Sequence, residues 1–206
     1  MVTVKIFVFT LALLSAGSFT GVAAQEPVAP PEAVKYYNAG VRAYRAGDQR
    51  AALDNLNKAI EIFPQYWKAL SSRGLVRKEQ GDHAGALRDY ALSIQINPRN
   101  AGAYGNRGML LRDQGDVDGA LADYATALSL DPNDYYTYNN RAVIREQRND
   151  RDGAMSDFNQ AIKLKPDYPE ALYNRGLLRR RLGDTVAGDA DIALAIKLNP
   201  KLGQKR

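Results

Sequence analysis

Four arginines and two glycines lie in the segment 173–184, which reads YNRGLLRRRLGD. Arginine presents a planar set of hydrogen-bond donors, so guanidinium groups beside glycine backbone could bind phosphate or a nucleic-acid backbone. The same residues could instead belong to the scaffold, with each arginine paired to a carboxylate of the same chain. Whether the pattern recurs elsewhere in the sequence distinguishes the two interpretations.

Few residues of the sequence could support catalysis or bind a metal. The chain has no cysteine and one histidine, His83. Disulfide bonds, thiolate metal sites and cysteine nucleophiles are therefore excluded, and neither a Ser-His-Asp triad nor a multi-histidine zinc site is indicated. The net charge of +5 and the 45% content of hydrophobic residues are ordinary for a globular protein. We predict a non-catalytic protein without a metal or a cofactor.

Residues 1–24 have the pattern of a secretory signal peptide. Lys5 precedes an apolar run, and Val22 and Ala24 fit the small-residue positions of a cleavage site before Gln25. The apolar run is shorter than the roughly 20 residues of a spanning helix, so no stable membrane span is expected after cleavage. A retained membrane anchor is the alternative. We predict an exported protein, periplasmic or secreted.

The remainder of the chain is repetitive. Residues 25–32, QEPVAPPE, contain three prolines and are predicted to form a linker. Proline then recurs every 34 residues, which divides residues 33–202 into five units and leaves 203–206 as a tail. The units are 33–66, 67–100, 101–134, 135–168 and 169–202.

Each unit contains the signals for two helices separated by a tight turn. A Gly-Asp pair lies in the middle of four units, and Asn149-Asp150 replaces it in the fourth. Glycine or asparagine can adopt the left-handed conformation that ends a helix, and the aspartate can cap the next helix. Proline ends the second helix, in which apolar residues at helical spacing form one buried face. The sequence predicts an all-α fold.

This pattern resembles the tetratricopeptide repeat family. The resemblance covers residues 33–202 and rests on the period, the helix-turn-helix pattern and the residue types at unit positions 4, 8, 20, 24, 27 and 32. It implies a helical-repeat solenoid, a right-handed superhelix of five 34-residue helix-turn-helix units. It further implies that the first helices line a concave groove, which binds extended peptides or helices.

Arginine at unit position 7, where the family usually has leucine, accompanies aspartate at unit position 23 in four units. In the first unit these positions hold Ala39 and Asn55, so the two residue types are absent together. We therefore predict an ion pair within each of the last four units. The pairs are Arg73 with Asp89, Arg107 with Asp123, Arg141 with Asp157, and Arg175 with Asp191. A stripe of arginines that binds a polyanion is the alternative.

The resemblance also implies which side chains face the groove, namely those at unit positions 2, 5, 9, 12 and 13. The candidate groove residues are Tyr37, Tyr44, Arg45, Lys68, Lys78, Met109, Arg112, Tyr136, Asn139, Tyr173 and Arg180. Tyrosines with basic residues at both ends suit a segment of a partner protein that has apolar anchors and a few carboxylates. Nucleic acid is not expected as a partner.

Asparagine recurs at unit position 6, as Asn38, Asn106, Asn140 and Asn174. Such an amide could hold the main chain of a ligand in the groove, or it could form hydrogen bonds within its own scaffold. The sequence leaves both roles open.

The C-terminal end is predicted to lack a capping helix. Asp189 occupies unit position 21, where the first four units have an apolar residue, as expected where no further repeat follows. Leu194 remains apolar in the same unit. Self-association through the C-terminal unit, as in a structural protein that assembles with itself, therefore stays open.

Overall fold

The computed structural model describes residues 28–204. These residues form ten α-helices and one short 3-10 helix, with no β-strand in the described range. The helices are α1 (Pro31–Arg45), α2 (Gln49–Ile62), α3 (Trp67–Glu79), α4 (His83–Ile96), α5 (Ala101–Asp113), α6 (Val117–Leu130), α7 (Tyr135–Gln147), α8 (Arg151–Leu164), α9 (Pro169–Arg181), α10 (Thr185–Leu198) and η1 (Pro200–Gln204). The predicted signal peptide, residues 1–24, lies outside the described range.

The first helix begins inside the predicted linker. Pro31 and Glu32 belong to α1, so the prediction of an extended segment up to residue 32 was wrong. Pro31 occupies the first turn, where proline is tolerated because that backbone nitrogen would have no partner within the helix. Glu32 adds a negative charge at the helix N-terminus, which the helix dipole favours.

The turn inside each helix pair has the predicted geometry. Gly47, Gly81, Gly115 and Gly183 have φ between 80° and 90°, and Asn149 takes their place in the fourth pair with φ of 62°. The aspartate that follows each of them caps the next helix by accepting a hydrogen bond from the backbone N–H of the third residue of that helix, as Asp82 does from Gly85 at 2.8 Å. Both predictions are confirmed.

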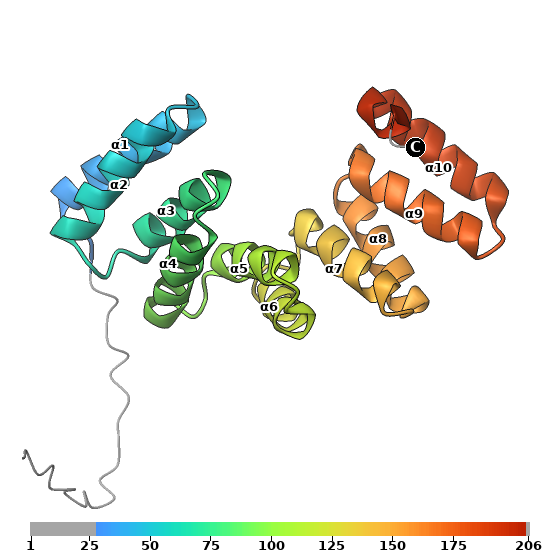
Figure 1. Cartoon of the computed structure of the whole chain (residues 1–206), viewed down its shortest axis with the longest axis horizontal. Coiled ribbons are helices and arrows are strands. Elements are labelled where there is room, and N and C mark those ends of the chain that lie inside the picture. Colours follow the sequence, from blue (N-terminus) through green and yellow to red (C-terminus); the bar gives the residue numbers. More distant parts are fainter. Residues whose placement is uncertain (1–27, 205–206) are drawn as a thin grey trace, which may run out of the picture.

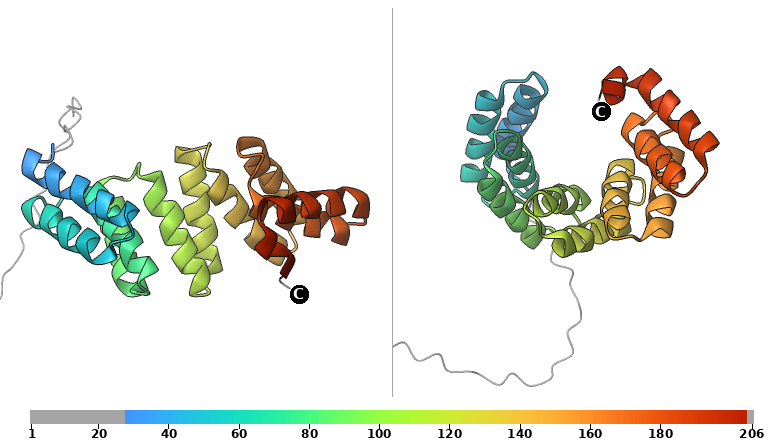
Figure 2. Two further views of the ribbon diagram at one scale, coloured as in Figure 1. Left: turned by 90° about the horizontal axis from the view of Figure 1, so that it is seen from above. Right: turned by 45° about the vertical axis from the view of Figure 1, so that its right-hand side comes forward.

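The helix pairs stack in sequence order and form an open arc (Figures 1 and 2). Each pair, α1 with α2 through α9 with α10, is a repeat, and its two members are called helix A and helix B. Each helix B packs on its own helix A and on the helix A that follows. Helices A of neighbouring repeats also meet, as α3 does with α1 and α5 and α9 does with α7, whereas neighbouring helices B make few or no contacts. The helices A therefore line the inner side of the arc.

Glycines in helix A allow the two helices of a repeat to approach closely. A Cβ at Gly108 would lie 2.8 Å from the ring of Tyr124, and one at Gly74 would lie 2.9 Å from the ring of Tyr90. Both tyrosines are fully buried. A glycine in a helix costs about 1 kcal/mol relative to alanine, and here the close packing of the ring offsets that cost.

A short helix follows the last repeat, contrary to the predicted tail without a cap. Residues 200–204 form η1, and Leu202 is buried against Leu172 and Ala195. The apolar side chain of Leu202 thus covers part of the surface on which another repeat would stack. No helix within residues 28–204 is both long and apolar enough to cross a bilayer.

Candidate functional site

A cavity lies on the inner side of the arc, between α7 and α9. Its volume is about 630 Å³, and this pocket is called the α7/α9 cavity. Its walls are Arg112, Tyr136, Asn139, Asn140, Val143, Tyr168, Glu170, Tyr173, Asn174 and Leu202. A pocket of this size can hold several atoms of a bound side chain together with part of its main chain.

Two smaller cavities lie at the other end of the arc. One, of about 220 Å³, is bounded by residues of α1 and α3 that include Tyr37, Tyr44 and Arg45. The other, of about 450 Å³, lies where the segment before α1 meets the α2–α3 turn, and Lys68 is among its walls. The structure therefore gathers the predicted groove residues into separate groups and not into one continuous pocket.

Eight of the eleven predicted groove residues line one of these cavities. Arg112, Tyr136, Asn139 and Tyr173 meet in the α7/α9 cavity, although they come from three repeats. The other three residues, Lys78, Met109 and Arg180, line none of the cavities.

Each of these three has neighbours of its own. Lys78 donates to Asn106 at 3.4 Å, and burial lowers the pKa of its ammonium group. Met109 packs against the buried cluster of Tyr124 and Ile144. Arg180 extends toward α10 and pairs with Asp189 at 3.4 Å.

Most charged groups on the groove side have a partner within the chain. Arg112 pairs with Asp113 at 2.9 Å, Arg181 pairs with Glu146, and Glu79 accepts from the hydroxyl of Tyr44. On the groove side, the side chains of Arg45 in the first repeat and Glu170 in the last form no ion pair or hydrogen bond with any described residue. Lys68 has no carboxylate partner and instead lies over the ring of Trp67, at 5.2 Å.

Burial changes the acidity of several tyrosines. The pKa of Tyr44 is raised to about 12, first by burial and then by its hydrogen bond to the Glu79 carboxylate. Burial also raises the pKa of Tyr168, with smaller contributions from Tyr136 and Glu170 nearby. Both phenols are therefore neutral hydrogen-bonding groups at physiological pH.

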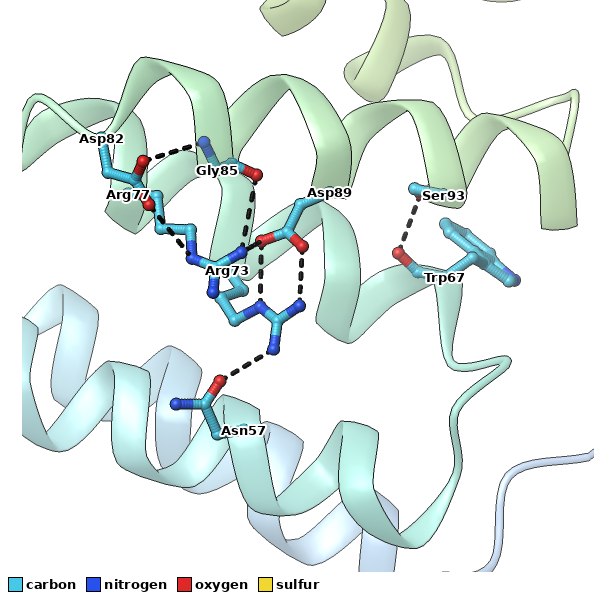
Figure 3. A network of polar contacts seen from close by, with 8 residues as sticks. All are labelled: Asn57, Trp67, Arg73, Arg77, Asp82, Gly85, Asp89 and Ser93. Carbon is cyan, nitrogen blue, oxygen red and sulfur yellow. Dashed lines mark hydrogen bonds and ion pairs between the residues drawn. The ribbon is translucent and has the colours of Figure 1, made fainter.

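The arginines at unit position 7 each contact the aspartate of the same repeat. Arg73 donates to Asp89 through Nε at 2.9 Å and Nη2 at 2.7 Å (Figure 3). The same two-bond geometry joins the other three predicted pairs, with distances of 2.7 to 2.8 Å. The four aspartates are between 1% and 8% exposed. Each buried carboxylate is thus compensated by a guanidinium group of the same repeat.

A second arginine, which the sequence analysis did not single out, reaches three of these aspartates. Arg77, Arg145 and Arg179 donate to the aspartate of their own repeat at 2.8 to 2.9 Å. Each lies four residues after the first arginine and so shares its helix face. The signal was present in the sequence as a second arginine at unit position 11 of the second, fourth and fifth units.

The first arginine also connects neighbouring repeats at two places. Nη1 of Arg73 donates to Asn57 on α2 at 2.8 Å (Figure 3), and Nη1 of Arg175 donates to Asn159 on α8 at 2.9 Å. Asn57 and Asn159 were likewise not recognised from the sequence. All four arginines of the segment 173–184 therefore pair with carboxylates of the chain.

The recurring asparagines have different environments. Asn106 donates to the carbonyl of Gly102 at 2.9 Å, and Asn174 donates to Oδ1 of Asn139 at 3.1 Å, so both bond within the scaffold. Oδ1 of Asn140 accepts from Nη1 of Arg112 at 3.4 Å. Asn140 is only 7% exposed, and its Nδ2 is buried without a hydrogen-bond partner among the described residues. Asn140 is the member of this set with a buried amide donor that has no partner among the described residues.

No group of three or more metal-ligating side chains occurs within residues 28–204. His83, at the start of α4, is exposed. The arrangement on the inner face of the arc is one of aromatic rings, amides and mostly compensated charges. Such a surface can bind another molecule by shape, apolar contact and hydrogen bonds.

Comparisons with known proteins agree with the stacked helix pairs. Two models described as "Tetratricopeptide repeat" match residues 37–104 and 101–134, and one described as "TPR repeat" matches residues 144–183. A search of curated proteins found no match.

Several solved structures share the fold. PilF of Pseudomonas aeruginosa is 19% identical with a TM-score of 0.73, over 84% of this chain and 83% of that one. MamA from Desulfovibrio magneticus RS-1 is 17% identical with a TM-score of 0.69, over 87% and 100%. YrrB, described as a TPR protein with an unusual peptide-binding site, is 20% identical with a TM-score of 0.64, over 84% and 90%.

These structural likenesses concern the fold. The matched models and the sequential stacking of helix pairs lead to the same conclusion: the chain belongs to the tetratricopeptide repeat family.

Proposed function

We propose that the chain is an exported, non-catalytic adaptor of the cell envelope that binds a segment of a partner protein along the inner face of the arc. The α7/α9 cavity is the principal contact in this proposal. It brings together Tyr136, Tyr168 and Tyr173, and tyrosine rings contribute strongly to protein interfaces because they bury a large area with little loss of conformational freedom. The tetratricopeptide fold supports a role in protein–protein interaction.

The observation that carries the proposal is the α7/α9 cavity of about 630 Å³, built by side chains from three consecutive repeats. Because stacked helices define its walls, little reorganisation would oppose binding. The peptide-binding site described for YrrB shows that a protein of this fold can hold a peptide, which is consistent with the same use here.

Site-specific photo-crosslinking tests the proposal. A photoreactive phenylalanine analogue at Tyr136 is expected to capture a defined protein from the periplasmic fraction of the source organism. The same analogue at Leu92 on α4 is the matched control, because the two residues are 47% and 46% exposed. The proposal is refuted if both positions capture the same proteins, or if Tyr136 captures none.

Export has its own test. The sequence pattern of residues 1–24 predicts a mature protein that begins at Gln25. N-terminal sequencing of the protein recovered from the periplasm should therefore start at that residue, and a protein retained with residue 1 in the cytoplasmic fraction would exclude export.

The paired arginines weigh against a polyanion as the main partner. The guanidinium groups at unit position 7 already contact buried aspartates, so their charge is compensated within the scaffold. A polyanion would have to compete with carboxylates at 2.7 to 2.8 Å.

Self-association is a second candidate function, supported by apolar residues on the last helix. Leu194 and Leu198 of α10 are each 43% exposed, and Val186 is 84% exposed. A molar mass that rises with protein concentration in light scattering, and falls to the monomer value in a Leu194→Glu, Leu198→Glu variant, would establish it.

A further inference from the structure

The α7/α9 cavity contains a carboxylate without a partner. Glu170, in the first turn of α9, lines the cavity and makes no ion pair or hydrogen bond with any described residue. Arg112, the basic residue among the walls of the cavity, is already paired with Asp113 and donates to Asn140. From the sequence we predict basic residues at both ends of the groove, but internal pairing leaves Glu170 as the wall residue of this cavity whose charge has no partner among the described residues.

Aromatic rings surround the same space. Tyr136, Tyr168 and Tyr173 are among its walls, and the rings of Tyr136 and Tyr168 lie with centroids 6.2 Å apart and planes inclined by 32°. The faces of tyrosine rings carry negative electrostatic potential and attract cations that lie over them. A carboxylate together with such rings is a combination that favours a cationic group.

Asn140, another wall residue of the cavity, has a buried hydrogen-bond donor. Nδ2 of Asn140 has no partner, while the Oδ1 of the same amide is held by Arg112. An unpaired buried N–H costs stability unless a ligand or water supplies an acceptor. A main-chain carbonyl of a bound segment is a neutral acceptor that requires no second positive charge.

We propose that the α7/α9 cavity binds a lysine or arginine side chain of the partner segment. Glu170 and the tyrosine rings contact the cation, and Asn140 Nδ2 donates to a main-chain carbonyl of the same segment. This assignment rests on the proposed function and specifies that the partner segment carries a basic residue where it meets the last two repeats. Carboxylates on the partner were expected from the sequence, and the assignment replaces that expectation for the α7/α9 cavity.

Nuclear magnetic resonance titration with three synthetic peptides tests the assignment. The probes are acetyl-Ala-Ala-Lys-Ala-Ala-amide and its norleucine and glutamate counterparts, which differ in charge at one side chain. The lysine peptide should shift the side-chain amide signals of Asn140 and the signals of Tyr136 and Tyr173. Its affinity should exceed that of the norleucine peptide about fivefold, and the glutamate peptide should bind more weakly still.

Matched variants identify the source of the preference. Glu170→Gln should reduce the affinity ratio of lysine to norleucine peptide to about one, whereas Glu146→Gln, which alters a groove carboxylate that is paired with Arg181, should leave it unchanged. Asn140→Ser should weaken both peptides equally. If this buried variant does not fold, Tyr136→Ala, at an exposed position, should weaken the lysine peptide more than the norleucine peptide.

The assignment is overturned if the lysine and norleucine peptides bind equally, if the preference survives Glu170→Gln, or if no peptide shifts these signals at about 10 mM. Such a result would leave the adaptor role standing provided that the cross-link at Tyr136 still captures a partner. Loss of that cross-link would instead refute the proposed function itself.

Discussion

The buried aspartate at unit position 23 has different hydrogen-bond partners in repeats two and three. Asp89 accepts three bonds, two from Arg73 and one from Arg77, and Arg73 also reaches Asn57 of the preceding repeat. Asp123 accepts only the two bonds from Arg107, because Leu111 replaces the second arginine. The arginine–aspartate network of the third repeat therefore has fewer hydrogen bonds, both within the repeat and to the repeat before it.

The glycine content of helix A also favours lower stability in repeat three than in repeat two. Helix α5 contains Gly102, Gly105 and Gly108, whereas α3 contains only Gly74. Each helical glycine lowers helix stability by about 1 kcal/mol relative to alanine. The comparison indicates that the middle of the arc opens more readily than the repeat before it, although both present the same overall packing.

The largest effect is expected when the buried carboxylate is removed. Asp89→Ala leaves two guanidinium groups without their acceptor and should lower the free energy of unfolding by about 3–5 kcal/mol. Asp123→Ala strands one guanidinium group, that of Arg107, which is more exposed than that of Arg73, so its cost should be roughly 1–2 kcal/mol smaller. Urea denaturation followed by circular dichroism measures both, and an Asp123→Ala variant that melts no earlier than wild type would contradict the pairing.

Two glycines of α5 should respond to alanine in opposite directions. Gly108→Ala places a Cβ 2.8 Å from the Tyr124 ring and should cost about 1–3 kcal/mol. Gly102→Ala meets only Asn100, at 3.7 Å, and should stabilise the protein by about 0.5–1 kcal/mol through helix propensity. Thermal melting of the two variants beside wild type provides the measurement, and equal shifts of the melting temperature would disprove the close approach of α5 and α6.

Replacing the second arginine of repeat two should make it behave like repeat three. Arg77→Leu removes one of the three bonds to Asp89 and should cost about 1–2 kcal/mol in urea denaturation. Arg88→Leu is the control, because Arg88 is exposed and forms no ion pair among the described residues; its effect should stay within about 0.5 kcal/mol. If the two variants lose equal stability, the additional arginine contributes nothing specific.

The smallest effect is expected at the buried tyrosine hydroxyls. Tyr90 and Tyr124 have buried hydroxyls without a partner, and Phe158 occupies the equivalent position in repeat four. Tyr90→Phe and Tyr124→Phe should therefore change stability at pH 7 by no more than about 1 kcal/mol, and in the stabilising direction. A substantial loss in either variant would mean that the hydroxyl has a bonding partner in solution.

Alkaline pH extends this comparison. Burial raises the pKa of both tyrosines, so the folded protein keeps these protons at a pH where the unfolded chain has lost them. Stability is then complete below about pH 10 and falls as the pH rises above the unfolded value. Unfolding followed from pH 8 to pH 12 should show a shallower loss in the phenylalanine variants than in wild type, and identical profiles would count against the raised pKa.

The fold could be predicted from the sequence because its determinants are local and repeated. The proline period, the Gly-Asp turns and the capping aspartates each specify backbone geometry within a few residues, and five copies reinforce one another. Arg107 and Asp123 could be matched because both residue types are absent from the equivalent positions of the first repeat, Ala39 and Asn55. Pro31 was misassigned because a proline-rich segment can equally form a linker or the first turn of a helix.

The site was harder to predict, because it depends on which groups compensate one another in three dimensions. Tyr168 ends one repeat and Glu170 begins the next, yet both line the same cavity. The family resemblance implies that Arg112 and Glu170, at unit positions 12 and 2, face the groove. It does not show that Asp113 compensates the charge of Arg112 while Glu170 has no partner. That outcome is set by side-chain geometry between repeats, which no single 34-residue pattern contains.

Hydrogen–deuterium exchange on the wild-type protein, with and without the partner recovered from the Tyr136 cross-link, tests the binding account most directly. Binding on the inner face of the arc predicts slower exchange in α5, α7 and α9, with α4, α6 and α8 unchanged. Slower exchange confined to α4, α6 and α8 would place the partner on the outer face and contradict the account.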